Sequence, residues 1–248
     1  MADPQTPETG PDAGIRQLAG RLADLFDARG PLVTGLTGSV ASGKTTLAGA
    51  LSDVLDDTLA IETVSTDGFL FPNDVLAERE LTLRKGYPET YDRAALAGAL
   101  SALREGEAAF PAYSHVTYDI DPALTRTIPR PDVLILEGLG FEPLSQPPRP
   151  AHEPDLLIYL DASEDDLLAW FLERFLRLWN AAREDPSSFY ANFLHMTEPE
   201  LLAFAQSVWE RINLPNLREN IAPLKARADI LLVKAGDHTI TIAEDRLA

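Results

Sequence analysis

Residues 32–46 have the sequence LVTGLTGSVASGKTT, and the expected fold follows from this stretch. An apolar run, Leu32 to Leu36, leads into a glycine-rich loop, and a helical pattern follows from Thr45 to about Leu55. The loop matches G-x-x-x-x-G-K-[ST], in which backbone N–H groups and the start of the next helix cradle phosphate groups. A strand before the loop and a helix after it distinguish such a site from a chance match.

The motif also assigns individual roles. Lys44 is expected to reach the β- and γ-phosphates of ATP, and the Thr45 hydroxyl is expected to hold Mg²⁺. The residues expected to bind ATP through the loop are Gly38, Ser39, Val40, Ala41, Ser42, Gly43, Lys44, Thr45 and Thr46.

Short apolar runs and helical patterns alternate along the rest of the chain. This alternation predicts an α/β fold of the P-loop NTPase type, with a mostly parallel sheet flanked by helices. We expect a disordered tail over residues 1–14 and one kinase domain over 15–248, with a helical lid or acceptor region at about 164–220. The expected strands are 32–36, 61–65, 132–136, 155–161 and 229–234, the expected later helices are 92–106, 164–182 and 198–211, and 146–154 is an expected loop.

Two acidic residues follow predicted strands, as the glycine-rich loop does. The carboxyl ends of parallel strands form one edge, so Asp67 and Glu137 should lie near the loop. Glu137 at this position can bind magnesium, or it can be a solvated acid at a strand end. For Asp67 three interpretations stay open: a base that accepts a hydroxyl proton, a metal ligand, or part of an ordinary Asp-Gly turn.

The composition limits the classes of partner. The 248 residues carry a formal net charge of −18, and such a field repels nucleic acid and anionic membranes, so neither is expected as a partner. No apolar run approaches the ~20 residues that a membrane-spanning helix needs. Cysteine is absent, and the first 25 residues lack a basic start followed by an apolar run. A cytoplasmic protein without a signal peptide is therefore expected.

Several residues carry a weaker signal. A lone histidine such as His115 is more often structural than functional. Arg174 and Arg177 lie in the helical stretch WFLERFLRLW, where arginine can clamp a phosphoryl group, although a solvated helix face is the default interpretation. The tryptophans Trp170, Trp179 and Trp209 are interpreted as packing residues only.

From about residue 31 to the end, the chain resembles the type I (bacterial) pantothenate kinases. Phosphoribulokinases and uridine kinases share the broader fold, but lack the runs YSHVTYDI and INLPNLREN. The segments that carry the resemblance are GSVASGKTT, STDGFLFPN, KGYPETYD, PAYSHVTYDI, LILEGL, IYLDA, RFLRLW, INLPNLRENIAPLKARADILLVK and GDH.

The resemblance implies transfer of the ATP γ-phosphate to the terminal hydroxyl of pantothenate, the first step toward coenzyme A, by a homodimer. It implies that Asp67 is the catalytic base and that His238 stacks on adenine. It also implies contacts to pantothenate or the transferring phosphate from Tyr113, His115, Tyr118, Arg174 and Asn213.

Some positions depart from the family pattern. Phe171 stands where the family usually has a tyrosine that touches the acceptor, and Gly49 stands where an arginine commonly helps to bind the inhibitor coenzyme A. Gly140 replaces an asparagine, and Leu224 replaces a threonine. Two other interpretations therefore stay open. One is a kinase for another small hydroxyl compound, such as a nucleoside, a sugar or a pantothenate-like acid, and the other is a nucleotide-binding regulator that transfers nothing.

Overall fold

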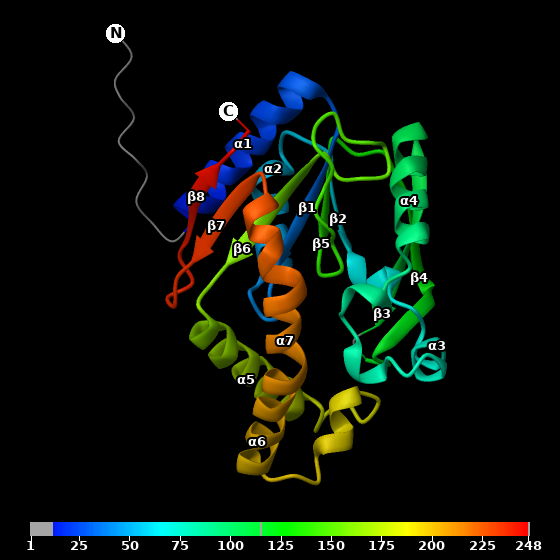
Figure 1. The fold of residues 1–248 in the computed structure, drawn as a ribbon, viewed down its shortest axis with the longest axis vertical. Coiled ribbons are helices and arrows are strands. Elements are labelled where there is room, and N and C mark those ends of the chain that lie inside the picture. The colour runs from blue at the N-terminus through cyan, green and yellow to red at the C-terminus, as the bar shows by residue number, and fades with distance from the viewer. Residues whose placement is uncertain (1–11, 115, 248) are drawn as a thin grey trace.

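The computed structural model describes residues 12–114 and 116–247. Within them, a six-stranded sheet has the strand order β2-β5-β1-β6-β7-β8 (Figure 1). All neighbouring strands in this sheet are parallel except β7 and β8. The strands of the sheet are β1 Leu32–Gly38, β2 Ile61–Ser65, β5 Val133–Glu137, β6 Leu156–Asp161, β7 Ile230–Lys234 and β8 Ile240–Asp245.

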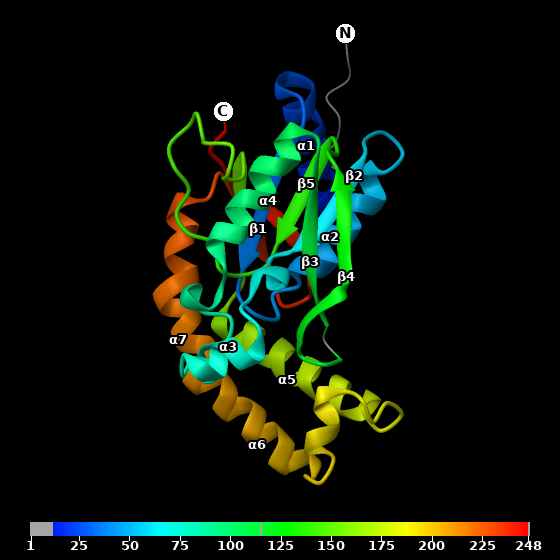
Figure 2. The same ribbon diagram turned by 90° about the vertical axis from the view of Figure 1, so that its right-hand side faces the viewer.

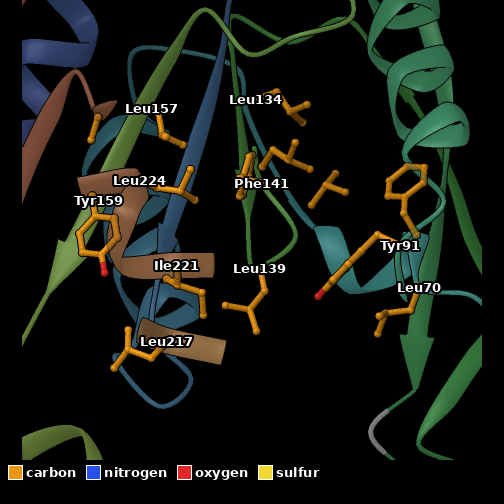
Figure 3. Packing of buried hydrophobic residues seen from close by; sticks show 14 of the residues in the cluster. Leu70, Tyr91, Leu134, Leu139, Phe141, Leu157, Tyr159, Leu217, Ile221 and Leu224 are labelled. Atoms are coloured by element: carbon orange, nitrogen blue, oxygen red, sulfur yellow. The ribbon is translucent and has the colours of Figure 1, made fainter. Parts of the chain in front are cut away.

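Side chains alternate across the sheet, and both faces are buried. In β5, Leu134 and Leu136 enter one core, while Val133 and Ile135 enter the other. Strand residues point alternately to opposite faces, so a strand covered on both sides is an unbroken apolar run. Figure 3 shows the first core, where Leu217, Ile221 and Leu224 of the C-terminal helical segment lie near Leu139 and Phe141.

Helices α1 and α2 cover the second core, and the other helices cover the first core or extend beyond the sheet (Figures 1 and 2). The backbone stays helical from α6 through π-helical and 3-10 segments to Arg227. The α-helices are α1 Ala13–Arg29, α2 Lys44–Leu55, α3 Asn73–Glu78, α4 Arg93–Glu105, α5 Glu164–Ala181, α6 Glu198–Val208 and α7 Leu214–Asn216. The 3-10 and π-helical segments are Thr66–Phe69, Thr82–Arg84, Pro88–Thr90, Phe189–Phe193, Trp209–Asn213, Leu217–Ile221 and Ala222–Arg227.

A separate antiparallel hairpin pairs β3, Glu107–Ser114, with β4, Asp119–Pro129. Figure 2 shows this hairpin beside α4, with α5 and α6 below it. Gly68 joins the hairpin to the sheet edge, because a Cβ there would lie 1.9 Å from the carbonyl oxygen of Pro111. Only glycine lets the chain after β2 pack this closely on β3.

The expected α/β fold with a mostly parallel sheet is confirmed, and residues 146–154 have no regular structure. One boundary was wrong: α1 begins at Ala13, inside the stretch expected to be disordered, because Gly14 and Leu18 are buried in that helix. Residues 1–11 of the expected tail lie outside the described residues. Strands β3, β4 and β8 were not predicted.

Candidate active site

The glycine-rich loop connects β1 to α2 through two glycines in the left-handed region. Gly38 has φ +149° and Gly43 has φ +93°. A Cβ on Gly38 would lie 2.4 Å from the carbonyl oxygen of Leu160, so a larger residue cannot occupy this position without moving β6. Ser39 and Ser42 are buried at 3 % and 0 % exposure, whereas Val40 and Ala41 are half-buried. The backbone of the loop is thus held tightly against the end of β6.

Lys44 begins α2, and its ammonium group folds back over the loop. It donates hydrogen bonds to the carbonyl oxygens of Gly38, at 3.1 Å, and Ser39, at 2.7 Å. Burial lowers the pKa of Lys44, although the charges of Glu137 and Asp67 act in the opposite direction. The buried ammonium group therefore lies within electrostatic range of both carboxylates that the sequence places at this edge.

Glu137 ends β5 beside the start of α2. Its Oε1 accepts a 3.1 Å hydrogen bond from the Thr45 hydroxyl, and the residue is only 6 % exposed. Burial raises the pKa of the Glu137 carboxyl, and the nearby Asp67 adds to this effect, while Lys44 and the Thr45 hydroxyl oppose it. A hydroxyl and a carboxylate that face each other are hard oxygen donors of the kind that Mg²⁺ prefers, so the pair fits a magnesium ion.

Asp67 lies in the 3-10 turn Thr66–Phe69 that follows β2. The Ser65 hydroxyl accepts a 3.2 Å hydrogen bond from the Asp67 backbone N–H and so caps this turn. Oδ1 of Asp67 accepts a 3.2 Å hydrogen bond from the Tyr91 hydroxyl. Burial raises the pKa of Tyr91 well above its usual value, and the Asp67 charge adds to this, so Tyr91 stays a neutral donor.

The tip of the β3–β4 hairpin brings two predicted tyrosines together. The rings of Tyr113 and Tyr118 meet edge to face at 5.7 Å, and the Tyr118 ring stacks on Phe189 at 4.3 Å. The Lys85 ammonium lies 4.7 Å and 4.9 Å from the two tyrosine ring centroids and donates to the Tyr118 carbonyl oxygen at 2.7 Å. The predicted residue His115 lies outside the described residues.

Three further predicted acceptor residues come from α5 and the helical segment after α6. Arg174 is exposed on α5. Its positive charge acts to lower the pKa of both Lys44 and Tyr118, so this face of the helix lies on the same side as these residues. Phe171 is 8 % exposed, and its ring packs 5.7 Å from that of Trp209. Asn213 is half-buried in the π-helical segment Trp209–Asn213.

His238 lies in the turn between β7 and β8, whereas Tyr113 and Tyr118 lie at the tip of the β3–β4 hairpin. It adopts φ +67°, and its ring stacks on Trp170 at 5.0 Å with an interplanar angle of 30°. Trp170 was interpreted as a packing residue only, yet it also has the Lys234 ammonium 4.2 Å from its ring centroid. The turn, α5 and the end of β7 therefore meet at one place.

Three residues near the predicted ones were not identified from the sequence: Lys85, Tyr91 and Lys234. Lys85 and Tyr91 lie in KGYPETYD, and Lys234 ends the run ADILLVK. For Lys85 and Lys234, the available signal was the rarity of lysine, since the chain contains only four lysines.

At position 140, the structure explains one departure from the family pattern. Gly140 has φ +76°, and a Cβ there would lie 2.6 Å from the Tyr91 ring. Glycine therefore leaves room for the ring whose hydroxyl contacts Asp67. Leu224, in place of a threonine, is 2 % exposed and extends the apolar core.

Comparison with known proteins agrees with this geometry. Residues 33–177 match the model of the phosphoribulokinase/uridine kinase family. A protein named pantothenate kinase from Myxococcus xanthus (strain DK1622) is 43 % identical over 222 residues, which cover 85 % of this chain and 70 % of that protein. Another of that name, from Sorangium cellulosum (strain So ce56), is 44 % identical over 241 residues, covering 92 % and 78 %.

A solved structure supports the fold alone. The D-glycerate 3-kinase of Cryptococcus neoformans superposes with a TM-score of 0.60 at 18 % identity, covering 93 % of this chain and 97 % of that one. The family match covers more than half of the chain, and the curated relatives exceed 40 % identity. The chain therefore belongs to the phosphoribulokinase/uridine kinase family of P-loop kinases and, within it, to the pantothenate kinases.

Proposed function

We propose that this ATP-dependent kinase phosphorylates the terminal hydroxyl of pantothenate to give 4′-phosphopantothenate, the first step toward coenzyme A. The observation that carries the acceptor assignment is the 43 % identity to a protein named pantothenate kinase over 85 % of the chain. The site geometry supports the phosphoryl-transfer chemistry, since Lys44, Asp67 and Glu137 interact electrostatically at one sheet edge.

The transfer needs a base for the acceptor hydroxyl. Asp67 supplies it: the hydroxyl oxygen bonds to the γ-phosphorus, the bond from that phosphorus to the β–γ bridging oxygen breaks, and the hydroxyl proton passes to the carboxylate. The Tyr91 hydroxyl donates to Oδ1, which leaves Oδ2 to accept the proton. Tyr91 thereby orients the base without taking part in the transfer.

Cations surround the phosphates in this proposal. The Lys44 ammonium turns from the loop carbonyls toward the β- and γ-phosphates, and Arg174 on α5 stabilises the charge on the transferring group. Thr45 and Glu137 would hold a magnesium ion, which would neutralise charge on the ATP phosphates. The remaining loop residues, Gly38 to Gly43 and Thr46, bind phosphate through their backbone N–H groups.

In this proposal the two substrates contact different residues. His238 stacks on the adenine of ATP, while Tyr113, His115, Tyr118, Phe171 and Asn213 contact the acceptor. We also propose that residues 15–248 act as one kinase domain, that the lid or acceptor region spans about 164–220, and that the protein is a cytoplasmic homodimer. Among the described residues, no helix is both long and apolar enough to cross a bilayer.

A kinase for another small hydroxyl compound is the second candidate. The observation that favours it is Phe171, which lacks the tyrosine hydroxyl usual at this position and packs against Trp209. A different acceptor would make use of such an apolar wall.

The experiment that separates the candidates is an acceptor panel. Protein, ATP and Mg²⁺ are mixed with pantothenate, uridine, D-glycerate or a sugar, and ADP release is measured. We expect turnover with pantothenate, and a fall of at least about a hundredfold in Lys44→Ala, which lacks the cation paired with the phosphates. Turnover of another compound but not of pantothenate would favour the second candidate, and ATP binding without any transfer would favour a regulator.

A further inference from the structure

Lys234, the last residue of β7, reaches across the sheet edge to the phosphate loop. Its ammonium group donates a 2.9 Å hydrogen bond to the carbonyl oxygen of Ser42. A Cβ on Gly43 would lie 2.8 Å from the same ammonium nitrogen. The tip of the lysine side chain therefore packs directly against Gly43, whose φ of +93° gives the loop its left-handed turn.

The contacted carbonyl belongs to the same peptide unit as the Gly43 N–H. A trans peptide is planar, so its C=O and N–H point in opposite directions. Gly43, with φ +93° and no side chain, does little to restrict rotation of this plane. A hydrogen bond that holds the Ser42 oxygen on one side therefore also directs the Gly43 N–H to the opposite side.

The ammonium group is itself held by Trp170 of α5. It lies 4.2 Å from the centroid of the Trp170 ring, within the range of a cation–π interaction. Burial lowers the pKa of Lys234. The His238 ring stacks on the same tryptophan at 5.0 Å, and its backbone N–H bonds to the Ala235 carbonyl oxygen at 2.9 Å within the turn that follows Lys234.

We propose that Lys234 is a positioning residue of the phosphate loop: held by Trp170, it orients the Ser42–Gly43 peptide so that the Gly43 N–H faces the bound polyphosphate. Lys234 needs no contact with the nucleotide for this role. The inference rests on the proposed use of ATP and is independent of which acceptor is phosphorylated.

The test measures binding of nucleotide and polyphosphate in the absence of an acceptor. One of the two probes lacks the adenine base. Dissociation constants of Mg²⁺–ADP and of inorganic tripolyphosphate are measured by titration calorimetry for the wild type and Lys234→Met. This variant keeps most of the aliphatic stem and removes the ammonium group. Both constants should rise by about ten- to a hundredfold, the range for one hydrogen bond to a charged group. The melting temperature is measured alongside to confirm that the variant is folded.

Three further variants sharpen the test. Lys225→Met is the matched control, because the Lys225 ammonium pairs with the Asp161 carboxylate, and it should leave both constants unchanged. Lys234→Arg keeps a cation that can stack on Trp170 and donate a hydrogen bond to the Ser42 carbonyl oxygen. This variant should therefore keep most of the wild-type affinity for both probes. Trp170→Leu leaves the lysine but removes its support, and should weaken tripolyphosphate about two- to thirtyfold.

The outcomes separate this inference from the proposed function. Unchanged tripolyphosphate binding in a folded Lys234→Met variant would overturn the inference. A loss of affinity confined to ADP would also overturn it, because the lysine would then act on the adenine base through His238. A loss in Lys234→Met that is absent from Trp170→Leu would also overturn it, since support by the ring would not matter. A wild type that binds neither probe would overturn both the inference and the proposed function.

Discussion

The hydroxyl of Tyr91 donates a hydrogen bond of 3.2 Å to Oδ1 of Asp67, the residue proposed as the base. Tyr91 is 5 % exposed, and Gly140 leaves the space that its ring occupies. This contact fixes one oxygen of the carboxylate and leaves the other for the acceptor. Orientation of the base therefore depends on a buried residue that contacts neither substrate in our proposal.

Tyr91→Phe should lower kcat by about tenfold or more, because a hydrogen bond to a charged group contributes roughly 1.5–3 kcal/mol. Tyr87→Phe is the control, because the Tyr87 hydroxyl bonds to the Ile212 carbonyl oxygen at 3.1 Å instead. Equal effects in the two variants would mean that Tyr91 is only structural.

Asp67→Asn keeps the shape of the side chain and removes its charge. If Asp67 is the base, kcat should fall by about two to four orders of magnitude while the dissociation constant of ATP changes little. Steady-state kinetics and nucleotide titration at several Mg²⁺ concentrations measure both quantities. Parallel loss of ATP and Mg²⁺ affinity would instead identify Asp67 as a metal ligand.

Glu137 should make the ligand-free protein less stable as the pH rises. Burial raises its pKa in the folded state, so the folded protein holds this proton to a higher pH than the unfolded chain does. Stability is then lost as the pH rises from the usual glutamate value of 4.5 through the raised value. Glu137→Gln lacks this loss, so its melting temperature relative to the wild type should increase across this window.

For a chain of this size, each kcal/mol shifts the melting temperature by about 2–4 °C. Calorimetric scans without nucleotide, from about pH 4.5 to 7.5, would measure the difference at each pH. Glu105→Gln, at an exposed position near the end of α4, is the control and should show no such trend. A difference between Glu137→Gln and the wild type that does not change with pH would contradict the prediction.

Coenzyme A should inhibit this enzyme only weakly, since Gly49 lacks the arginine that commonly contacts the inhibitor. Gly49 is exposed on α2, and a Cβ there would meet nothing within 4 Å, so the fold permits a larger residue. Gly49→Arg should strengthen inhibition by about ten- to a hundredfold, as expected for one hydrogen bond to a charged group. Inhibition constants measured against ATP, with Gly49→Ala as the control, test this. Potent inhibition of the wild type at micromolar coenzyme A would contradict the prediction that inhibition is weak without an arginine at position 49.

Phe171→Tyr should lower KM for pantothenate by about two- to tenfold with kcat nearly unchanged, because one neutral hydrogen bond contributes roughly 0.5–1.5 kcal/mol. Phe175, which packs 5.9 Å from Phe171 in the same aromatic cluster, provides the control Phe175→Tyr. A Phe171→Tyr enzyme that loses turnover of another alcohol, and gains nothing with pantothenate, would point to that alcohol as the substrate.

The arrangement of strand, glycine-rich loop and helix could be predicted because its signal is local: two glycines, a lysine and a threonine lie within eight positions, between a strand and a helix. The hydrogen-bond partners of Ser42 in this loop and of Asp67 beside it could not be predicted. Tyr91 meets Asp67 across 24 positions, and Lys234 meets Ser42 across 192 positions. Such pairs arise from strand order and from turns, which a single sequence does not specify.

Two of the missed strands, β4 and β8, and the helical segment that ends at Arg227 have physical explanations. Strand β4 is mostly exposed or half-buried, and β8 contains Ala243, Glu244 and Asp245, so neither has the apolar alternation that predicts a half-buried strand. The helical backbone continues to Arg227 although Pro215 and Pro223 predict interruptions. The structure places Pro215 in α7, between two π-helical segments, and Pro223 in the 3-10 segment that follows the second of them.

The central claim is most directly tested by identifying the product formed from pantothenate. The purified enzyme, with Mg²⁺ and ATP labelled at the γ-phosphate, is incubated with pantothenate, and labelled product and ADP are quantified by mass spectrometry. We predict one 4′-phosphopantothenate for each ADP, with both nearly absent in Lys44→Ala and Asp67→Asn. ADP release without labelled phosphopantothenate, or label found on another alcohol and never on pantothenate, would contradict the account.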